Sequence, residues 1–368
     1  MSRAQRQKLR AMSPVRRKIL RFFTPRFWRR PDSDFGPRRG PVIHVVILDG
    51  TMSSLEPVCR TNAGRAYHLC RRMGSALSIY YEPGLQWRDW RSAMAVMTGR
   101  GINRQIRRAY GYLASRYRPG DKIFLLGYSR GAYAVRSLAG VIDQMGLLSA
   151  DHATERNIRD VYRHYEGDPR SESARRFAAA HCMDSIEIEM IGVWDTVKSL
   201  GFNAPVLWRL SEKHHAFHND HLSHNVKAGY QALALDETRV AYKPVLWSSP
   251  DGYQGRVEQV WFSGTHGDVG GQLGGYEAAR PLANIPLVWL LERAQMHGLP
   301  LPEGWSGEIA QDATAPMLGT FRGHGRWFIT RRARKPLQTP SEQLHDSVML
   351  RRSVQPAPRG WMGFGKTV

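Results

Sequence analysis

The chain has 368 residues, of which 42% are hydrophobic and 23% charged, and its formal net charge is +21. This share of apolar residues can build a core and excludes an intrinsically disordered chain, and no apolar run approaches the roughly 18 residues of a membrane-spanning helix. The three cysteines have no CxxC spacing, which predicts neither a disulfide framework nor a zinc site and favours a reducing compartment, the cytoplasm.

The positive charge is concentrated at the two ends of the chain. Residues 1–40 hold 13 Lys or Arg and 2 acidic residues, a charge of +11, and residues 331–368 hold 8 and 2, a charge of +6. The residues between them therefore carry only +4. Because the body is nearly neutral, a nucleic-acid-binding domain is not the favoured interpretation of the charge.

Residues 1–41 are expected to form a basic arm outside the main domain. On a short helix its apolar residues would share one face, with basic side chains around the rest. These apolar residues are Val15, Ile19, Phe22 and Phe23. The pattern is typical of a membrane interface, so we expect residues 1–40 to bind an anionic membrane surface peripherally. The alternatives for these residues are a solvated tail and a segment that contacts nucleic acid. Of the two possible partners, an anionic membrane is a simpler explanation than nucleic acid.

From residue 42 onward, short apolar runs alternate with longer amphipathic runs. The apolar runs predict strands at residues 44–48, 77–81, 122–127, 186–194 and 257–262. The longer runs predict helices at residues 102–117, 130–145 and 283–296. This alternation indicates an α/β fold with a mostly parallel central sheet and helices on both of its faces. We expect this domain to span residues 42–352 and a C-terminal tail to follow at 353–368.

The alternation lapses at about residues 200–256, where the sequence becomes rich in His, Trp and Pro. We expect a lid or insertion over the edge of the sheet there. On a helix, His214, His218 and His221 would share a face at a spacing that suits a transition metal. A polar lid explains the same composition, up to His224, without a metal, and we expect neither a metal nor a cofactor.

Residues 127–131 read Gly-Tyr-Ser-Arg-Gly, the G-x-S-x-G pattern of a nucleophile elbow. An apolar strand leads into the pattern and a predicted helix follows it, which is the context that the elbow requires. We therefore expect Ser129 to be a nucleophile on a strained turn, with the backbone N–H of Arg130 placed to stabilise an oxyanion. A tight turn with an incidental serine is the alternative.

A serine nucleophile needs a base, and the base needs an acid that orients it, in the chain order Ser, Asp or Glu, His. Asp195 and His266 each follow the carboxyl end of a predicted strand, so we expect them to complete the triad. A turn residue and a core histidine are the alternatives. Asp236 and Asp268 are the rival acids, and we expect Asp268, only two residues from His266, to shape that loop instead.

The second oxyanion donor is expected in the loop after an early strand. Asp49, Gly50 and Thr51 follow the predicted strand at residues 44–48, and Gly50 allows a close approach of the backbone. We expect the backbone N–H of Gly50 or Thr51 to serve as this donor. The Asp49 carboxylate is expected to hydrogen-bond within the loop and to support the site.

Several motifs follow one another along the chain. They are LDGT at 48–51, GYSRGAY at 127–133 running on to Arg136, GVWDTV at 192–197, ALALDE at 232–237, VWF at 260–262 leading to HGDVGG at 266–271, and HDSV at 345–348. Together they resemble the catalytic domain of type VI secretion phospholipase effectors, over about residues 42–352. In that family a tyrosine soon follows the last glycine run, whereas here residues 272–274 intervene before Gly275 and Tyr276.

The resemblance implies an α/β-hydrolase fold, serine catalysis on ester bonds and phospholipids as substrates, with Ser129, Asp195 and His266 at the triad positions. The sequence therefore predicts a serine hydrolase that cleaves carboxylic esters of phospholipids or other lipids through an acyl-enzyme on Ser129. The alternative is a catalytically silent hydrolase fold that binds an anionic membrane or nucleic acid through its basic ends.

Overall fold

The computed structural model describes residues 40–57, 60–84, 100–197, 221–248, 252–321 and 330–355. It divides into two units, Met1–Gly40 and Pro41–Val368, and the elements described below belong to the second. Most of the expected basic arm and of the expected C-terminal tail, residues 1–39 and 356–368, lie outside the described residues.

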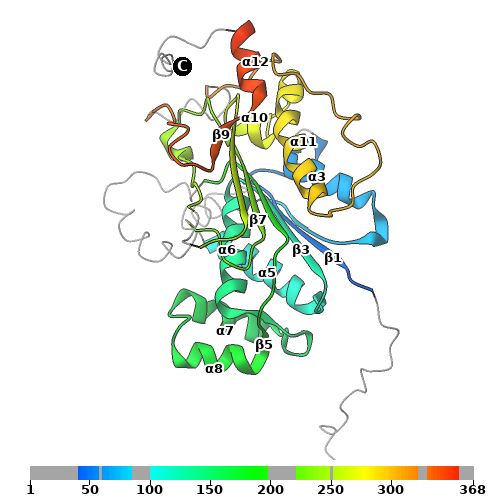
Figure 1. Cartoon of the computed structure of the whole chain (residues 1–368), viewed down its shortest axis with the longest axis vertical. Helices are drawn as coiled ribbons and strands as arrows, with labels where there is room; N and C mark the ends of the chain where they lie inside the picture. Colours follow the sequence, from blue (N-terminus) through cyan, green and yellow to red (C-terminus); the bar gives the residue numbers. More distant parts are fainter. Residues whose placement is uncertain are drawn as a thin grey trace, which may run out of the picture. The chain divides into compact units, whose positions relative to one another are not determined.

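A seven-stranded sheet forms the centre of the described part (Figure 1). Its strands are β1 (Ile43–Leu48), β2 (Leu77–Glu82), β3 (Lys122–Tyr128), β6 (Met190–Trp194), β7 (Ala228–Ala234), β8 (Arg256–Phe262) and β9 (Glu342–Leu344). They run in the order β2-β1-β3-β6-β7-β8-β9, and each neighbouring pair is parallel. Two short strands, β4 (Leu147–Leu148) and β5 (Cys182–Met183), form a separate antiparallel pair.

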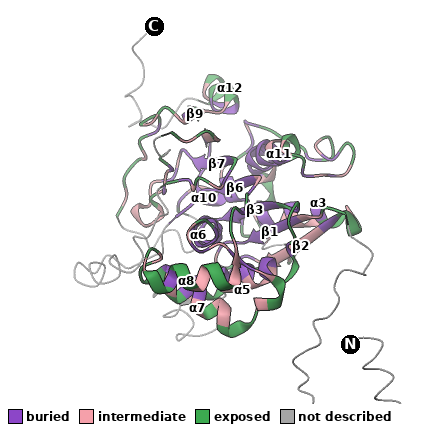
Figure 2. Cartoon of the chain, turned by 60° about the horizontal axis from the view of Figure 1, so that its bottom comes forward, coloured by how far each residue is buried: buried purple, intermediate pink, exposed green. Residues whose placement is uncertain are grey.

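Helices cover both faces of the sheet. The described α-helices are α3 (Asn62–Arg71), α5 (Arg100–Arg116), α6 (Arg130–Met145), α7 (Glu155–Glu166), α8 (Glu172–His181), α10 (His266–Gly270), α11 (Arg280–Met296) and α12 (Asp346–Val354). Helices α3, α10 and α11 contact one another on one face, whereas α5, α6 and α7 contact one another on the opposite face. Figure 2 shows α5, α7 and α8 below the sheet and α11 above it.

The alternation of side chains along β1 explains why a buried strand of this kind is apolar throughout. Val45 and Ile47 pack in the core on the side of α3 and α11, while Val46 and Leu48 pack on the side of α5 and α6. Successive side chains of a strand point to opposite faces, so a sheet that is covered on both faces needs an apolar residue at each position. This two-sided core confirms the α/β architecture that the sequence predicts.

Strand β7 lies within residues 200–256, so the lid or insertion that the sequence predicts there does not extend over all of them. All seven residues of β7 are buried, and the strand pairs with both β6 and β8. Four of them are Ala or Gly, which have low strand propensity, so the usual β-branched signal is missing. The space is tight, since a Cβ on Gly229 would lie 2.7 Å from the Leu222 side chain. Residues 198–220 and 249–251 lie outside the described residues.

The other predicted elements agree closely with the structure. The strands expected at 44–48, 77–81, 122–127 and 257–262 are β1, β2, β3 and β8, each with one residue more at one end. The helix expected at 130–145 is α6, and the strand expected at 186–194 begins only at Met190. None of the described helices is both long enough and apolar enough to span a membrane.

Candidate active site

Ser129 makes the turn between β3 and α6. Its backbone has φ 57° and ψ −119°, in the positive-φ region that residues with a side chain rarely adopt. Two glycines make this turn possible, because a Cβ on Gly131 would lie 2.1 Å from the backbone oxygen of Leu48, and a Cβ on Gly127 would lie 2.7 Å from the backbone oxygen of Gly131. The turn is thus strained at Ser129 and closely packed on both sides of it.

Three side chains from separate strands meet in hydrogen-bond contact. His266 Nε2 lies 2.9 Å from Ser129 Oγ, and His266 Nδ1 lies 2.6 Å from Asp195 Oδ2. Ser129 follows β3, Asp195 follows β6, and His266 begins α10 after β8. The carboxyl ends of parallel strands share one edge of the sheet, which is why residues far apart in the sequence meet there. The structure therefore brings together the three residues that the sequence predicts as a triad.

Asp195 has a second partner that the sequence analysis missed. Arg334 Nη1 donates to Asp195 Oδ1 at 2.6 Å, and Arg334 Nη2 donates to Oδ2 at 3.0 Å. The Oδ1 atom also accepts from the backbone N–H of Ala234 at 3.0 Å. Burial favours the neutral acid, but the charge of Arg334 and the hydrogen bond from His266 outweigh it and hold the pKa of Asp195 well below its usual value. Asp195 is thus kept ionised in a fully buried position.

No local signal points to Arg334, because it lies 139 residues from Asp195 in a stretch that reads as basic tail. Its side chain is only 6% exposed. Arg351, in the same stretch, is also buried and donates to the backbone oxygens of Ala313 and Ala315 at 2.7 and 2.8 Å. Part of the C-terminal positive charge therefore lies inside the catalytic domain and is not available to an external partner.

His266 is enclosed by aromatic rings and held at its backbone. The ring of Tyr128 stacks on the imidazole with centroids 4.9 Å apart, and the ring of Tyr242 lies tilted against it at 4.7 Å. The backbone N–H of His266 donates to Glu237 Oε2 at 3.1 Å. Burial lowers the pKa of His266 below its usual 6.5, although Asp195 opposes the shift. The imidazole is therefore neutral at neutral pH, the form in which it can accept a proton.

Glu237 is a second residue whose position only the structure reveals. Its side chain is fully buried and pairs with Arg239, whose Nη2 lies 2.6 Å from Glu237 Oε2. Burial alone would raise the pKa of Glu237, but the hydrogen bonds and charge of Arg239 outweigh it and hold that pKa below its usual value. Glu237 is thus a buried anion that fixes the backbone where His266 begins α10.

The two rival acids do not contact the imidazole. Asp268 Oδ2 accepts from the backbone N–H and the hydroxyl of Thr265 at 2.8 and 2.7 Å, and Oδ1 accepts from the backbone N–H of Leu318 at 2.7 Å. Asp236 Oδ2 accepts from the backbone N–H of Gly264 at 2.6 Å. Burial raises the pKa of both carboxyl groups. Both acids bind the loop that leads to His266.

The loop after β1 lies directly against Ser129. A Cβ on Gly50 would lie 2.5 Å from the ring of the buried Tyr128 and 3.2 Å from Ser129 Cβ, so a side chain at this position would displace the site. The backbone N–H of Gly50 donates to Asp49 Oδ1 at 2.7 Å, which engages one of the two donors that the sequence predicts for the oxyanion. Thr51 is the other, and its backbone oxygen accepts from Gln272 Nε2 at 2.9 Å.

Asp49 is buried behind this loop. Its carboxylate accepts from the Thr61 hydroxyl at 2.8 and 2.7 Å and from the Tyr81 hydroxyl at 2.8 Å. Burial raises the pKa of Asp49 to about 6, against the effect of these hydrogen bonds. The carboxylate therefore ties the loop to α3 and β2 and does not contact Ser129 or His266.

Gln272, the first of the residues that interrupt the glycine run, links two loops of the site. Gln272 accepts from the Tyr128 hydroxyl at 3.3 Å through Oε1, while its Nε2 donates to Thr51. It thereby joins the loop after α10 to the loop after β1.

Among the described residues, no group of three or more His, Cys, Asp or Glu side chains is placed to hold a metal ion. His214, His215 and His218 lie outside the described residues.

Comparison with known proteins gives a family match and a relative. The sequence model described as "T6SS, Phospholipase effector Tle1-like, catalytic domain" matches residues 43–293. The uncharacterized protein YEL023C of Saccharomyces cerevisiae is 26% identical over 231 residues, which cover 55% of this chain and 32% of that protein. The chain thus spans about a third of the length of this relative.

Two solved structures are also similar to the chain. An uncharacterized protein from Pseudomonas aeruginosa is 16% identical with a TM-score of 0.41, over 74% of this chain and 49% of that one. The structure of the Tle1 effector bound to the VgrG spike of the type 6 secretion system is 18% identical with a TM-score of 0.30, over 64% and 52%. Since the family match covers well over half of its residues, this chain belongs to the family of Tle1-like phospholipase effector catalytic domains.

Proposed function

We propose that this protein is a serine hydrolase that cleaves carboxylic ester bonds of phospholipids or other lipids. The observation that carries the proposal is the pair of hydrogen bonds from His266, at 2.9 Å to Ser129 and at 2.6 Å to Asp195. The family of the chain supports a lipid substrate. The strained backbone of Ser129 also supports it, because such strain is typical of a nucleophile elbow.

In the proposed reaction, Ser129 Oγ attacks the ester carbonyl carbon while His266 Nε2 accepts the hydroxyl proton. The tetrahedral intermediate collapses, the bond to the alcohol oxygen breaks, and His266 returns the proton to the leaving alcohol. Water, activated by the same imidazole, then hydrolyses the acyl-enzyme and releases the acid. Asp195 accepts from Nδ1–H throughout, which fixes the tautomer and stabilises the imidazolium that forms.

We assign the oxyanion site to backbone donors on both sides of Ser129. Arg130 is the first residue of α6, so its N–H belongs to the positive end of that helix. Thr51 is the second donor in the proposal, because the N–H of Gly50 is engaged by Asp49. Gln272 supports the second donor by holding the backbone oxygen of Thr51.

The experiment that tests the proposal is covalent labelling with a fluorophosphonate, combined with hydrolysis of a soluble ester. The wild-type protein should be labelled on Ser129, and Ser129→Ala should lose the label and lower kcat by more than about a thousandfold. Ser115→Ala is the matched control, since Ser115 is exposed on α5, where its hydroxyl donates to the backbone oxygen of Tyr112 and accepts from Arg116 Nη1.

Two results would contradict the proposal. Hydrolysis that survives in Ser129→Ala would exclude this serine as the nucleophile. A wild-type protein without label and without activity would favour the alternative, a silent hydrolase fold that binds a membrane through its basic residues.

A further inference from the structure

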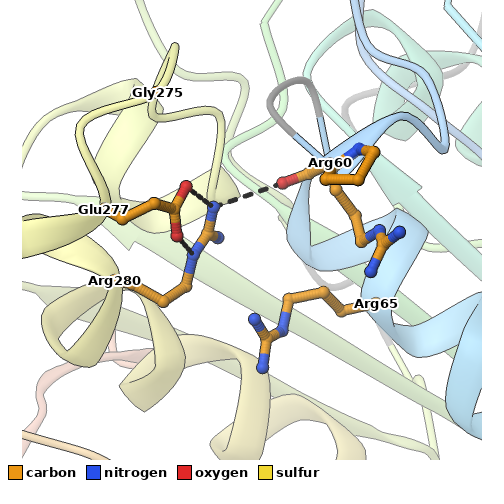
Figure 3. A pocket seen from close by; sticks show the side chains of 6 residues that line it. Arg60, Arg65, Gly275, Glu277 and Arg280 are labelled. Carbon is orange, nitrogen blue, oxygen red and sulfur yellow. Dashed lines mark hydrogen bonds and ion pairs between the residues drawn. The ribbon is translucent and has the colours of Figure 1, made fainter.

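A pocket of about 400 Å³ opens between the start of α3 and the segment that leads into α11 (Figure 3). We call it the arginine pocket, and the described residues that line it are Pro57, Arg60, Arg65, Gly275, Glu277 and Arg280. Figure 3 shows the side chains of its three arginines around one space, with Arg65 extending from α3 toward Arg280. Its volume lies within the range of ordinary small-molecule sites.

Only one of the three positive charges has a carboxylate partner within the described part of the chain. Arg280 Nε and Nη2 donate to the two carboxylate oxygens of Glu277 at 3.0 and 3.2 Å. Arg60 donates through Nε and Nη2 to the backbone oxygen of Leu55 at 3.3 and 3.1 Å, which does not neutralise its charge. The pocket therefore carries three guanidinium groups against one carboxylate.

Arg65 differs from the other two arginines, because no described residue accepts a hydrogen bond from its guanidinium. Burial and the neighbouring charges of Arg280 and Arg60 hold the pKa of Arg65 below its usual value, against the opposing effect of Glu277. Burial has the largest effect on this pKa, and the repulsion from the two neighbouring guanidinium groups acts in the same direction. An anion in the pocket would relieve this repulsion and would supply Arg65 with an acceptor.

The charge at the pocket comes from the arginines and not from the end of α3. The first turn of α3 carries Arg65 and no acidic residue. The end of the helix itself is already capped, because the Thr61 hydroxyl accepts from the backbone N–H of Gly64 at 3.1 Å and donates to the buried Asp49 carboxylate. The three arginines therefore favour a negatively charged ligand.

We propose that the arginine pocket binds a phosphate group. A guanidinium presents a planar fork of N–H donors that matches the oxygens of a phosphate, and several such forks can share the oxygens of one tetrahedral anion. The volume leaves room for a phosphate with further atoms attached to it. The phosphate belongs either to a lipid head group or to a soluble phosphate compound.

The arginine pocket adjoins the candidate active site through one loop. Arg280 Nη1 donates to the backbone oxygen of Gly271 at 3.0 Å, and the next residue, Gln272, contacts both Tyr128 and Thr51. A phosphate that engages Arg280 would thus hold the loop that supports the backbone beside Ser129. Binding at the pocket does not itself depend on ester hydrolysis, so it can be measured in the inactive Ser129→Ala background.

The test measures binding of inorganic phosphate by calorimetry, and binding of phosphatidylcholine vesicles with and without phosphatidylglycerol. Arg65→Gln should weaken binding of the phosphate probe by about tenfold or more, and Arg65→Lys should weaken it less, because it keeps the charge but loses the fork. The matched control is Arg156→Gln on α7, whose side chain is 89% exposed and lies on the opposite face of the sheet. Thermal unfolding checks that each variant is folded.

The outcomes separate the two sources of phosphate. Inorganic phosphate binding that depends on Arg65 supports the pocket as a site for a soluble phosphate compound. Binding only of the vesicles that contain phosphatidylglycerol, again dependent on Arg65 beyond the control, supports a lipid head group. If neither probe binds, or if Arg65→Gln behaves like Arg156→Gln, the proposal is wrong.

Discussion

Asp195 is shared between His266 and Arg334, and this sharing determines the electrostatics of the candidate site. The guanidinium lies on both carboxylate oxygens, at 2.6 and 3.0 Å, while the imidazole bonds to one of them at 2.6 Å. A buried carboxylate without such a partner would take up a proton more readily. Arg334 therefore keeps Asp195 ionised. Its positive charge also cancels part of the attraction that the Asp195 carboxylate exerts on the imidazolium form of His266.

A change of Arg334 should therefore move the pH profile of hydrolysis. In the wild type, burial holds the pKa of His266 below 6.5, so the acid limb of kcat/KM should have its midpoint below pH 6.5. In Arg334→Gln the negative charge of Asp195 is no longer balanced by a guanidinium, so it stabilises the imidazolium form of His266 more strongly. The pKa of His266 therefore rises, and the acid limb of kcat/KM moves to higher pH. The measurement is kcat/KM for a soluble ester across the pH range.

Arg331→Gln is the control for this prediction, because Arg331 Nη1 donates to the Thr320 hydroxyl at 2.7 Å and belongs to the same stretch of chain. Its acid limb should coincide with that of the wild type. If Arg334→Gln lowers kcat while the limb stays in place, Arg334 has a structural role only.

At the scale of elements, the turn between β3 and α6 depends on contacts with β1. Gly131 lies in the first turn of α6, and a Cβ there would come within 2.1 Å of the backbone oxygen of Leu48. Backbone atoms cannot move aside as a flexible side chain can. The spacing between β1 and the first turn of α6 is therefore so small that one added methyl group would have to increase it.

Gly131→Ala should destabilise the fold and reduce hydrolysis together. Overpacking of this kind costs about 1–3 kcal/mol of the free energy of unfolding, and the displaced α6 would carry the N–H of Arg130 away from its position. Urea unfolding and ester hydrolysis measure the two effects. Gly307→Ala is the control, since a Cβ there would lie 3.4 Å from the backbone oxygen of Gly304, an ordinary van der Waals contact. Equal stability of the two variants would contradict this interpretation.

At the scale of the whole molecule, the positive charge at the two ends of the chain has two separate explanations. Arg334 and Arg351, in the C-terminal stretch, are buried in the catalytic domain. Residues 1–40 carry a charge of +11. We therefore propose that this N-terminal segment supplies the affinity for an anionic membrane and that the catalytic domain supplies the chemistry.

Deletion of residues 1–40 should weaken binding to anionic vesicles and leave hydrolysis of a soluble ester unchanged. Basic residues near an anionic surface contribute about 1 kcal/mol each, so the loss should exceed about a hundredfold at low salt. Co-sedimentation with phosphatidylglycerol vesicles measures the binding, and phosphatidylcholine vesicles are the control. Unchanged affinity after the deletion would show that the segment has no such role.

Much of the fold could be predicted because its signals are local. The apolar runs of β1, β3 and β8 and the pattern of residues 127–131 each lie within a few residues. β7 was not predicted, because its small residues are suited to the close packing against the strands on both sides of it. A short window of sequence contains no information about those neighbours. The tight space at Gly229 exists only once Leu222 is in place.

By itself, the sequence determined an α/β chain with a serine on a tight turn and with Asp195 and His266 at the ends of later strands. Only the tertiary structure decided which acid reaches the imidazole, that Arg334 shares this acid, and that Asp49 engages the N–H of Gly50. The reason is physical. Backbone conformation follows from neighbouring residues, whereas the partner of a buried charge is decided by which distant segments the packed sheet brings to the same edge.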